Sequence, residues 1–382
     1  MIAKIALPII LVILLTHLYF DWAFLRRKPW WLRLCVWLIP LCLVIATWRM
    51  ASVPDYFPAD LATLDAYLRG LMCYVVPAAL LALGLLLVRL FRLKGRWPRF
   101  GVWVLPVAVV LVWLYGYNVG FRQFEVRHVE LSFDDLPEAF DGYRIVQWSD
   151  AHVGTLTGSR QPILQRCVDS INAQHADMVA FVGDMQNMRP EELEPHLKLL
   201  GSIKARDGVF SVLGNHDYAE YVSDDDFQKN QNVGKTITLQ EDMGWKLLRN
   251  TFFYVHRGQD SIVVSGMEND GEGRFPQLGN VHAALYGLQR SSFVVMLEHD
   301  PTSWRRKILP HSHVQLTLSG HTHAGQMRLF GWSPAALRYH EYDGLYEQGN
   351  RKLYVTKGLG GVVPFRLGVP GEIVVITLKV KR

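Results

Sequence analysis

The first third of the chain is dominated by long runs of hydrophobic residues without charged interruptions. Four such runs lie at about residues 5–25, 30–48, 71–90 and 101–120. Each run has about 20 residues, the length at which a helix rising ~1.5 Å per residue crosses a hydrocarbon core of ~30 Å. Trp and Tyr residues lie near the ends of the runs, as is typical of membrane–water interfaces. The pattern predicts a transmembrane domain of about four helices over residues 1–121.

From about Phe124 the pattern changes to short β-rich runs separated by amphipathic segments and glycine-rich turns. Helices are predicted at residues 160–173 and 191–202. Alternation of strands with helices favours an α/β fold with crossover connections, so residues 122–382 are expected to form a second domain. The predicted strands are residues 129–133, 143–148, 178–182, 209–213, 261–265, 293–298, 314–318, 353–356 and 372–378.

Charge divides the chain at the same place. Residues 1–121 contain 12 Lys and Arg against 4 Asp and Glu. Residues 122–382 contain the remaining 28 Lys and Arg and the remaining 31 Asp and Glu. The net charge of +5 therefore belongs to the apolar part, and we expect no nucleic-acid partner. The 4 cysteines include no Cys-x-x-Cys pair, which argues against a zinc knuckle, a redox motif or a disulfide framework.

The loops between the apolar runs predict an orientation. The first loop (residues 26–33) and the third (residues 89–99) are rich in Lys and Arg, whereas the second mixes two Arg with Asp55, Asp60 and Asp65. Positively charged loops remain in the cytoplasm, and an even number of spans then places both chain ends outside it. We therefore expect a multi-pass inner-membrane protein whose polar domain is extracytoplasmic or periplasmic.

Side chains able to bind metals follow five of the predicted strands. They are Asp150 and His152, Asp184, Asn215 and His216, His299, and His321 and His323. Loops at the carboxyl ends of strands in α/β sheets converge on one site. These carboxylate, amide and imidazole groups suffice for two divalent ions if one carboxylate bridges them, and the mixture of O and N ligands suits Mn, Fe or Zn better than Ca or Mg.

Such a centre predicts phosphoryl chemistry. Two metals about 3.5–4 Å apart polarise a phosphoryl oxygen and lower the pKa of a bridging water, and the resulting hydroxide attacks in line. A further imidazole can donate a proton to the leaving oxygen.

The order of the motifs resembles one known family. Five blocks carry the likeness: Asp150-Ala-His152, Gly183-Asp184-Met-Gln-Asn187, Gly214-Asn215-His216-Asp217, His299, and Gly320-His321-Thr-His323. In this order they closely resemble the calcineurin-like metallophosphoesterase superfamily, over roughly residues 143–378. The resemblance implies a central β-sandwich flanked by helices (αββα). The flanking sequence is similar to a bacterial branch that includes lipid-linked phosphohydrolases, UDP-2,3-diacylglucosamine hydrolases and transmembrane proteins with a metallophosphoesterase domain.

The resemblance also implies roles for the motif residues. The first metal is expected on Asp150, His152 and His323, the second on Asn215, His299 and His321, with Asp184 bridging the two. His216 is the expected general acid. Asn187 replaces an aspartate that usually supports the catalytic histidine; an Asn still orients the ring but cannot stabilise its charge, and Asp217 is the expected compensation.

The expected substrate is the phosphorylated head group of a membrane lipid. The first predicted strand begins within ten residues of the last apolar run, so the link holds the domain within about 35 Å of the bilayer, where lipid phosphates have a high effective concentration. The sequence leaves three alternatives open: a soluble-nucleotide or cyclic-nucleotide phosphodiesterase, a UDP-2,3-diacylglucosamine hydrolase of lipid A synthesis, and a non-catalytic receptor or scaffold. Two polar insertions, residues 218–235 and 269–288, are expected to shape the mouth of the site.

Overall fold

A computed structural model describes residues 3, 5–53 and 58–382 of the chain. Asp55, one of the acidic residues of the second loop, lies outside the described residues. The chain forms two compact units, Met1–Gly116 and Tyr117–Arg382.

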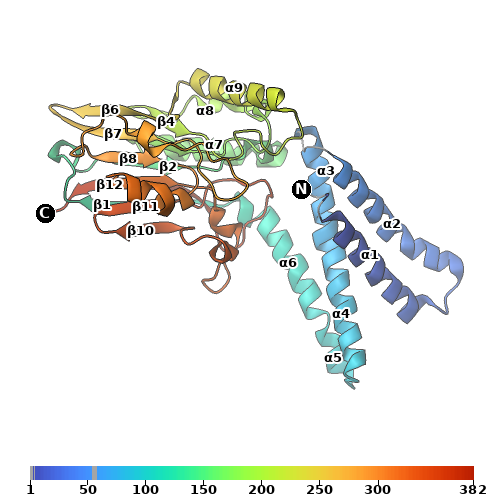
Figure 1. The fold of residues 1–382 in the computed structure, drawn as a ribbon. Coiled ribbons are helices and arrows are strands. Elements are labelled where there is room, and N and C mark those ends of the chain that lie inside the picture. The colour runs from blue at the N-terminus through green and yellow to red at the C-terminus, as the bar shows by residue number, and fades with distance from the viewer. Residues whose placement is uncertain (1–2, 4, 54–57) are drawn as a thin grey trace. The chain divides into compact units, whose positions relative to one another are not determined.

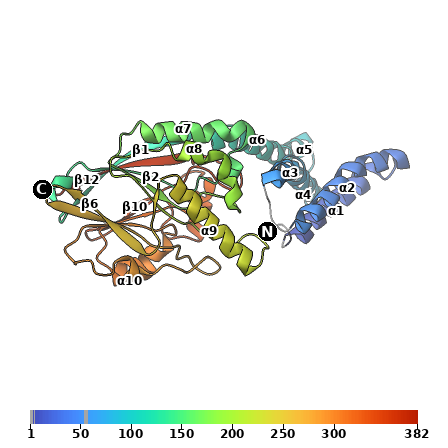
Figure 2. The same ribbon diagram turned by 90° about the horizontal axis from the view of Figure 1, so that it is seen from above.

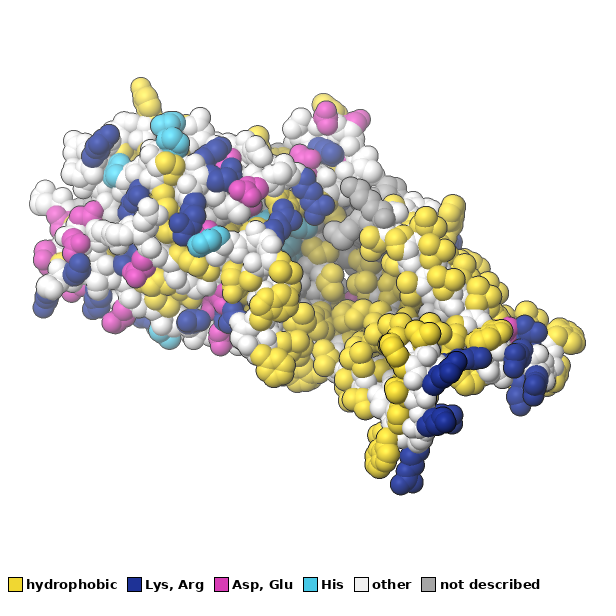
Figure 3. Space-filling view, turned by 60° about the horizontal axis from the view of Figure 1, so that its bottom comes forward, with side chains coloured by type: hydrophobic (Ala, Val, Ile, Leu, Met, Phe, Trp, Pro, Cys, Tyr) yellow, Lys and Arg dark blue, Asp and Glu magenta, His cyan; other side chains and the backbone are white. Residues whose placement is uncertain are grey.

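The first unit consists of helices. Four of the described helices are long and apolar enough to cross a membrane: Ala6–Leu25, Trp30–Ser52, Ala62–Leu90 and Arg96–Arg122. They are built from α1 (Ala6–Phe20), α2 (Trp30–Ser52), α3 (Pro58–Gly70), α4 (Val76–Leu90), α5 (Arg96–Gly101) and α6 (Val104–Asn118). Hydrophobic side chains cover the outside of these helices (Figure 3), as helices that face lipid require.

The two basic loops belong to the same end of this helical unit. The α1–α2 connection and the α4–α5 connection both lie at the lower end of the helices in Figure 1. Lys and Arg side chains gather there in the space-filling view (Figure 3). The two positively charged loops therefore lie at one end of the helical unit, which is compatible with the predicted orientation.

The second unit contains two six-stranded mixed sheets. The first has the order β1-β12-β2-β3-β4-β5 and the second β10-β11-β9-β8-β7-β6. The strands are β1 (Phe124–Phe133), β2 (Arg144–Trp148), β3 (Met178–Val182), β4 (Val209–Val212), β5 (Lys246–Leu247), β6 (Thr251–Arg257), β7 (Asp260–Gly266), β8 (Val294–Leu297), β9 (Leu316–Ser319), β10 (Gly344–Gln348), β11 (Arg351–Val355) and β12 (Gly371–Val380). The central strands β2, β3 and β4 are parallel, and so are β7, β8 and β9.

Alternation along the strands builds three hydrophobic layers. In β3, Val179 and Phe181 face α7 (Gln161–Asn172), while Met178 and Val182 face the other sheet. The strands of the second sheet alternate in the same way, toward the first sheet on one face and toward α10 (Val281–Ala284) on the other. Figure 2 shows α7 and α8 (Leu197–Leu200) on one side of the sheets and α10 on the opposite side. The expected αββα architecture behind four apolar helices is confirmed.

One local prediction was wrong. The single helix predicted over residues 191–202 is two 3₁₀ turns followed by the four-residue α8. Pro195 lies in the middle of that stretch and lacks the backbone N–H that a continuous helix needs. The insertion at residues 218–235 leads into a helix, α9 (Asp226–Asp242), whose first turn is capped by the Asp225 carboxylate accepting from the backbone N–H of Gln228.

Candidate metal centre

The candidate site lies beyond the carboxyl ends of five strands, as predicted. Asp150 and His152 follow β2, Asp184 follows β3, and Asn215 and His216 follow β4. From the second sheet, His299 follows β8, and His321 and His323 follow β9. All eight predicted residues therefore reach the site from central parallel strands of both sheets.

The backbone at the site adopts conformations that most residues avoid. Five of the non-glycine site residues have left-handed φ angles: Asp150 (51°), His152 (45°), Asp184 (61°), His321 (70°) and His323 (50°). Each such angle costs energy in an L-residue, and strain of this kind is concentrated at functional sites. The chain therefore turns sharply after β2, β3 and β9 and brings these side chains toward a common point.

Glycines next to the motifs permit the close approach of the loops. A Cβ atom on Gly214 would lie 2.2 Å from Oδ1 of Asp184, and a Cβ on Gly320 would lie 2.6 Å from Oδ2 of Asp150. Both distances are shorter than a carbon–oxygen contact allows. Gly214 and Gly320 are therefore required by packing against these carboxylates.

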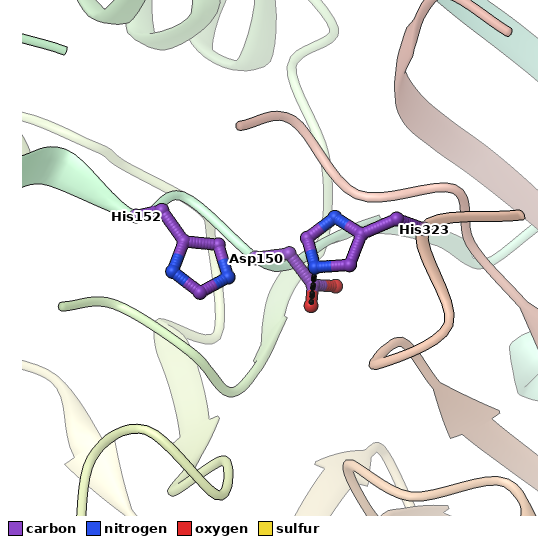
Figure 4. Close-up of side chains that lie close together, drawn as sticks. All are labelled: Asp150, His152 and His323. Carbon is purple, nitrogen blue, oxygen red and sulfur yellow. Dashed lines mark ion pairs between the residues drawn. The ribbon is translucent and has the colours of Figure 1, made fainter. Parts of the chain in front are cut away.

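The first cluster contains Asp150, His152 and His323. One ligand atom of each lies within 4.8 Å of the others, and Nε2 of His323 is 3.3 Å from Oδ1 of Asp150. Figure 4 shows the two imidazole rings on either side of the Asp150 carboxylate. Both ring nitrogens of His152 are buried and have no hydrogen-bond partner among the described residues, so a metal ion fits the donor set.

The second cluster contains Asp184, His299 and His321, again with ligand atoms within 4.8 Å of one another. Nε2 of His299 lies 3.2 Å from Oδ2 of Asp184. The Asn215 side-chain oxygen points at both rings, 3.2 Å from Nε2 of His299 and 2.7 Å from Nδ1 of His321. Asp184 also groups with His152 and His216, so its carboxylate is shared between the two clusters.

Burial and charge set the protonation of these groups. Burial lowers the pKa of His152 to about 3, and it also lowers the pKa values of His321 and His323. These three rings are therefore neutral near neutral pH, the form that binds metals. Burial also disfavours the charge of His299, but the Asp184 carboxylate raises its pKa to about 10. Against the effect of burial, the charges of His299 and His216 keep the pKa of Asp184 well below its usual value.

His216 belongs to neither of these two clusters but groups with Asp184 and His152, and its ring lies 4.8 Å from the His152 ring. Its backbone N–H donates to Oδ1 of Asp184 at 2.8 Å, and its Nδ1–H donates to the backbone carbonyl of Asn187 at 2.6 Å. Because a carbonyl can only accept, this contact fixes the proton on Nδ1 and directs Nε2 the other way. The Tyr221 ring lies against the His216 ring at a centroid distance of 4.3 Å.

Asn187 supports His216 by a different route from the one expected. Its side-chain amide donates to Oγ1 of Thr155 at 2.9 Å instead of facing the ring. The orientation of the ring depends on the Asn187 carbonyl, and the backbone here is held by the buried Glu192 carboxylate, which accepts from the N–H groups of Asn187 and Met188 at 2.6 and 3.0 Å.

Asp217 orders two loops and does not contact the His216 ring. Its buried carboxylate accepts from the backbone N–H groups of Asp184, Met185, Gln186 and Gly214 at 2.9 to 3.3 Å. Burial and the neighbouring Asp184 charge raise its pKa to about 7. Asp217 therefore fixes the position of the Asp184 backbone, so the compensation expected of it is indirect.

Sequence reasoning missed several residues around the clusters. Nε2 of His321 contacts the Tyr339 hydroxyl at 3.0 Å and Oδ2 of Asp300 at 3.4 Å, and the Tyr221 hydroxyl accepts from the Asn215 amide at 2.7 Å. Tyr221 does lie in the first polar insertion expected at the mouth, and Asp300 directly follows His299. Tyr339 could not be predicted from the sequence, because it lies outside every motif.

Comparison with known proteins identifies the domain. The family model described as calcineurin-like phosphoesterase matches residues 143–325. "Uncharacterized metallophosphoesterase YkuE" of Bacillus subtilis is 30% identical over 257 residues, which cover 64% of this chain and 82% of that protein.

Two vertebrate relatives are named "Transmembrane protein with metallophosphoesterase domain". The Danio rerio protein is 33% identical over 291 residues (74% of this chain, 63% of that protein). The Bos taurus protein is 28% identical over 271 residues (66% of this chain, 57% of that protein). The matched region thus spans less than two thirds of either vertebrate protein. The motif order, the two-sheet fold and these relatives agree, and the chain belongs to the calcineurin-like phosphoesterase family.

Proposed function

We propose that the chain is a membrane-anchored phosphohydrolase that uses two divalent metal ions to cleave a phosphoester or pyrophosphate bond of a lipid head group. The observation that carries this proposal is the position of the Asp184 carboxylate, which lies 3.7 Å from Nε2 of His152 and 3.2 Å from Nε2 of His299. A carboxylate between two imidazole-rich clusters has the arrangement that a bridging ligand needs.

The chain's own residues would hold the metals in two sets. Asp150, His152 and His323 form one, and Asn215, His299 and His321 form the other, with Asp184 common to both. The ligand types suit Mn, with Fe or Zn as the other candidates. When bound, two such ions polarise a phosphoryl group and lower the pKa of a coordinated water. The Val182 carbonyl accepts from Nδ1–H of His299 at 2.7 Å and orients that ring with Nε2 toward Asp184.

His216 is the proposed proton donor. Its ring is held at Nδ1 by the Asn187 carbonyl and its backbone by Asp184. A protonated ring held in this way presents Nε2–H to the leaving oxygen of a phosphoester, and transfer of that proton completes the cleavage.

The lipid assignment is supported by the connection to the apolar helices. α6 ends at Asn118 and β1 begins at Phe124. Six residue steps span at most about 21 Å, so the start of the domain stays close to the bilayer that holds α6. A substrate confined to the same bilayer then has a raised effective concentration.

Hydrolysis by purified protein tests this proposal. The full chain with Mn²⁺ is expected to hydrolyse an aryl phosphodiester, and His216→Ala is expected to lower turnover by roughly 10²–10⁴ while metal content stays unchanged. Wild-type turnover in that variant would remove His216 from the mechanism.

Native lipid extract supplies the second part of the test. Incubation with the wild-type protein is expected to change a phosphorylated lipid species seen by mass spectrometry, and an Asp184→Ala variant is expected to change none. Consumption of soluble nucleotides with an unchanged lipid profile would replace the lipid assignment with a nucleotide phosphodiesterase.

A further inference from the structure

A short segment beside the metal centre carries hydrophobic side chains that face away from the protein. We call residues 326–337, which begin three residues after His323, the apolar hairpin. Phe330 is fully exposed, Leu337 is 79% exposed, and Leu329 and Trp332 are 45% and 49% exposed. Clusters of exposed hydrophobic residues of this kind mark contacts with membranes or other proteins.

The turn at the tip of the apolar hairpin holds Phe330 in an unfavourable backbone conformation. Leu329 and Trp332 exchange backbone hydrogen bonds of 2.9 Å in both directions, which closes a two-residue turn. Phe330 and Gly331 at its centre have φ angles of 51° and 83°. Asn and Gly are the residues that favour such a turn. A Phe there is strained, and its fully exposed side chain makes no packing contact with the described residues that would offset the strain, which indicates a contact outside the protein.

The base of the apolar hairpin is fixed to the metal centre. Oγ of Ser333 donates to the carbonyl of Ala324 at 2.6 Å, and Nε2 of Gln326 donates to the carbonyl of Val363 at 3.1 Å. Ala324 directly follows the ligand His323. The tip therefore holds a defined position relative to the metal ligands.

The chain that pairs with the apolar hairpin also packs against Gly120, near the end of the last apolar span. A Cβ atom on Gly120, which lies in the apolar span Arg96–Arg122, would be 2.0 Å from the carbonyl oxygen of Arg366. The next residue, Leu367, pairs with the apolar hairpin: its N–H donates to the carbonyl of Gln326, and its carbonyl accepts from the N–H of Arg328. One short stretch of chain thus lies between the span's end and the hairpin, so a bilayer that holds the span is within reach of the tip.

Positive charge lies close to His321, one of the candidate metal ligands. Arg338, directly after Leu337, lies over the Phe275 ring at 4.9 Å, and Arg274 lies 5.7 Å from the same ring. The Phe275 ring in turn is 4.8 Å from the ring of His321. Guanidinium groups at this place attract phosphate head groups.

We propose that the apolar hairpin inserts into the bilayer interface, so that the metal centre takes the phosphate of a lipid whose acyl chains remain in the membrane. The proposal rests on the proposed function for its substrate, but the insertion itself does not depend on catalysis. A bilayer is favoured over a protein partner because the stretch that pairs with the hairpin packs against Gly120, at the end of an apolar helix, and because basic side chains follow the hairpin.

Depth in the membrane is the first test. The full chain is reconstituted in vesicles of phosphatidylcholine and phosphatidylglycerol, with Cys35, Cys42 and Cys73 replaced by Ser and a polarity-sensitive fluorophore attached to Phe330→Cys. The fourth cysteine, Cys167, is buried. The matched control carries the label at Tyr286→Cys, an aromatic position 84% exposed beyond the short α10.

The label at residue 330 is expected to emit at shorter wavelength and to be quenched by lipids with spin-labelled acyl chains, whereas the label at residue 286 emits as in water. Emission from residue 330 as in water would overturn the proposal. A blue shift without quenching by lipid would also overturn it, because a protein surface would then cover the hairpin.

The second test compares two substrates with the same leaving group. One is a nitrophenyl phosphodiester of diacylglycerol in vesicles, and the other is soluble bis-nitrophenyl phosphate. Phe330→Asp is expected to lower the ratio of the vesicle rate to the soluble rate roughly 10- to 100-fold, while Tyr286→Asp keeps the wild-type ratio. An unchanged ratio in Phe330→Asp would contradict insertion. If wild-type protein hydrolyses neither substrate, the proposed function fails and the fluorescence result still decides the insertion.

Discussion

At the scale of single residues, the site depends on groups that hold the ligands as well as on the ligands themselves. The Asp184 carboxylate accepts from the backbone of His216 while it lies within 4 Å of two imidazoles. Asp217 holds the backbone of Asp184, and Glu192 holds that of Asn187. Supporting contacts of this kind orient ligands and fix their protonation states.

The support of His216 leads to a first prediction. Asn187→Ala keeps the carbonyl that orients the ring, so turnover is expected to stay within about threefold of wild type. Glu192→Ala removes the carboxylate that holds the backbone of residues 187–189, and turnover is expected to fall about 10- to 100-fold with metal content unchanged. Steady-state kinetics with metal analysis measure both. An equal fall in turnover in the two variants would mean that the Asn187 side chain helps to orient the His216 ring.

The charge on His299 leads to a second prediction. The Asp184 carboxylate raises the pKa of His299 to about 10, so without metal its ring is protonated near neutral pH and must lose that proton to become a ligand. Because of this proton on His299, metal affinity is expected to increase about tenfold for each unit by which the pH is raised, up to about pH 10. Calorimetry in buffers of different ionisation enthalpy measures the proton, and His299→Gln is expected to abolish its release. Proton-neutral binding by wild-type protein at pH 7 would contradict the prediction.

At the scale of elements, the loops after β3, β4 and β9 pack so closely at Gly183, Gly214 and Gly320 that a larger residue would clash. The loops after β3 and β4 approach so closely that a Cβ on Gly214 would lie 2.2 Å from the Asp184 carboxylate. Left-handed turns at Asp150, Asp184 and His321 then direct side chains from both sheets into one point. The strained turns persist because the sheets beneath them are packed on both faces.

Gly214→Ala is expected to displace Asp184 and to lower affinity for the second metal by at least about tenfold. Gly234→Ala provides the control, because a Cβ at that position in α9 meets nothing within 4 Å. That control is expected to keep metal binding and to stabilise the fold by about 0.5–1 kcal/mol. Metal titration and thermal unfolding measure the pair, and wild-type affinity in Gly214→Ala would contradict the steric argument.

Much of this could be predicted from the sequence because it is encoded locally. The motif residues directly follow apolar strands, so Asp150 and His321 could be predicted as metal ligands from the sequence, and the structure places both in clusters with other candidate ligands. Glu192 and the Asn187 carbonyl could not be identified, because their roles arise where the chain folds back on itself. Every residue has a main-chain carbonyl oxygen, so the residue type does not reveal that this oxygen has a role. The helix predicted over residues 191–202 was wrong because the apolar spacing hid the effect of Pro195.

At the scale of the whole molecule, the four apolar helices and the sheet domain lie in one chain with a short connection between α6 and β1. The family membership and the helices able to cross a membrane are established by the comparisons and the fold. We propose, from the two basic loops at one end of the helices, that residues 122–382 lie outside the cytoplasm.

A reporter fused after Arg382 tests this orientation. A secreted phosphatase at that position is expected to be active, because positively charged loops stay inside and four spans return the chain to the outside. A fluorescent protein that matures only in the cytoplasm is expected to stay dark. Fluorescence from the second fusion would place the domain in the cytoplasm, where the nucleotide-linked lipid precursors of lipid A synthesis are made.

The central claim is that two metal ions bound around Asp184 carry out the hydrolysis, and a metal titration tests it most directly. Metal-free protein is titrated with Mn²⁺ while bound metal and hydrolysis of an aryl phosphodiester are followed together. We predict that activity appears as the second equivalent binds, and that Asp184→Ala stays inactive throughout. Full activity in the metal-free protein, or in a protein that binds a single ion, would contradict the account.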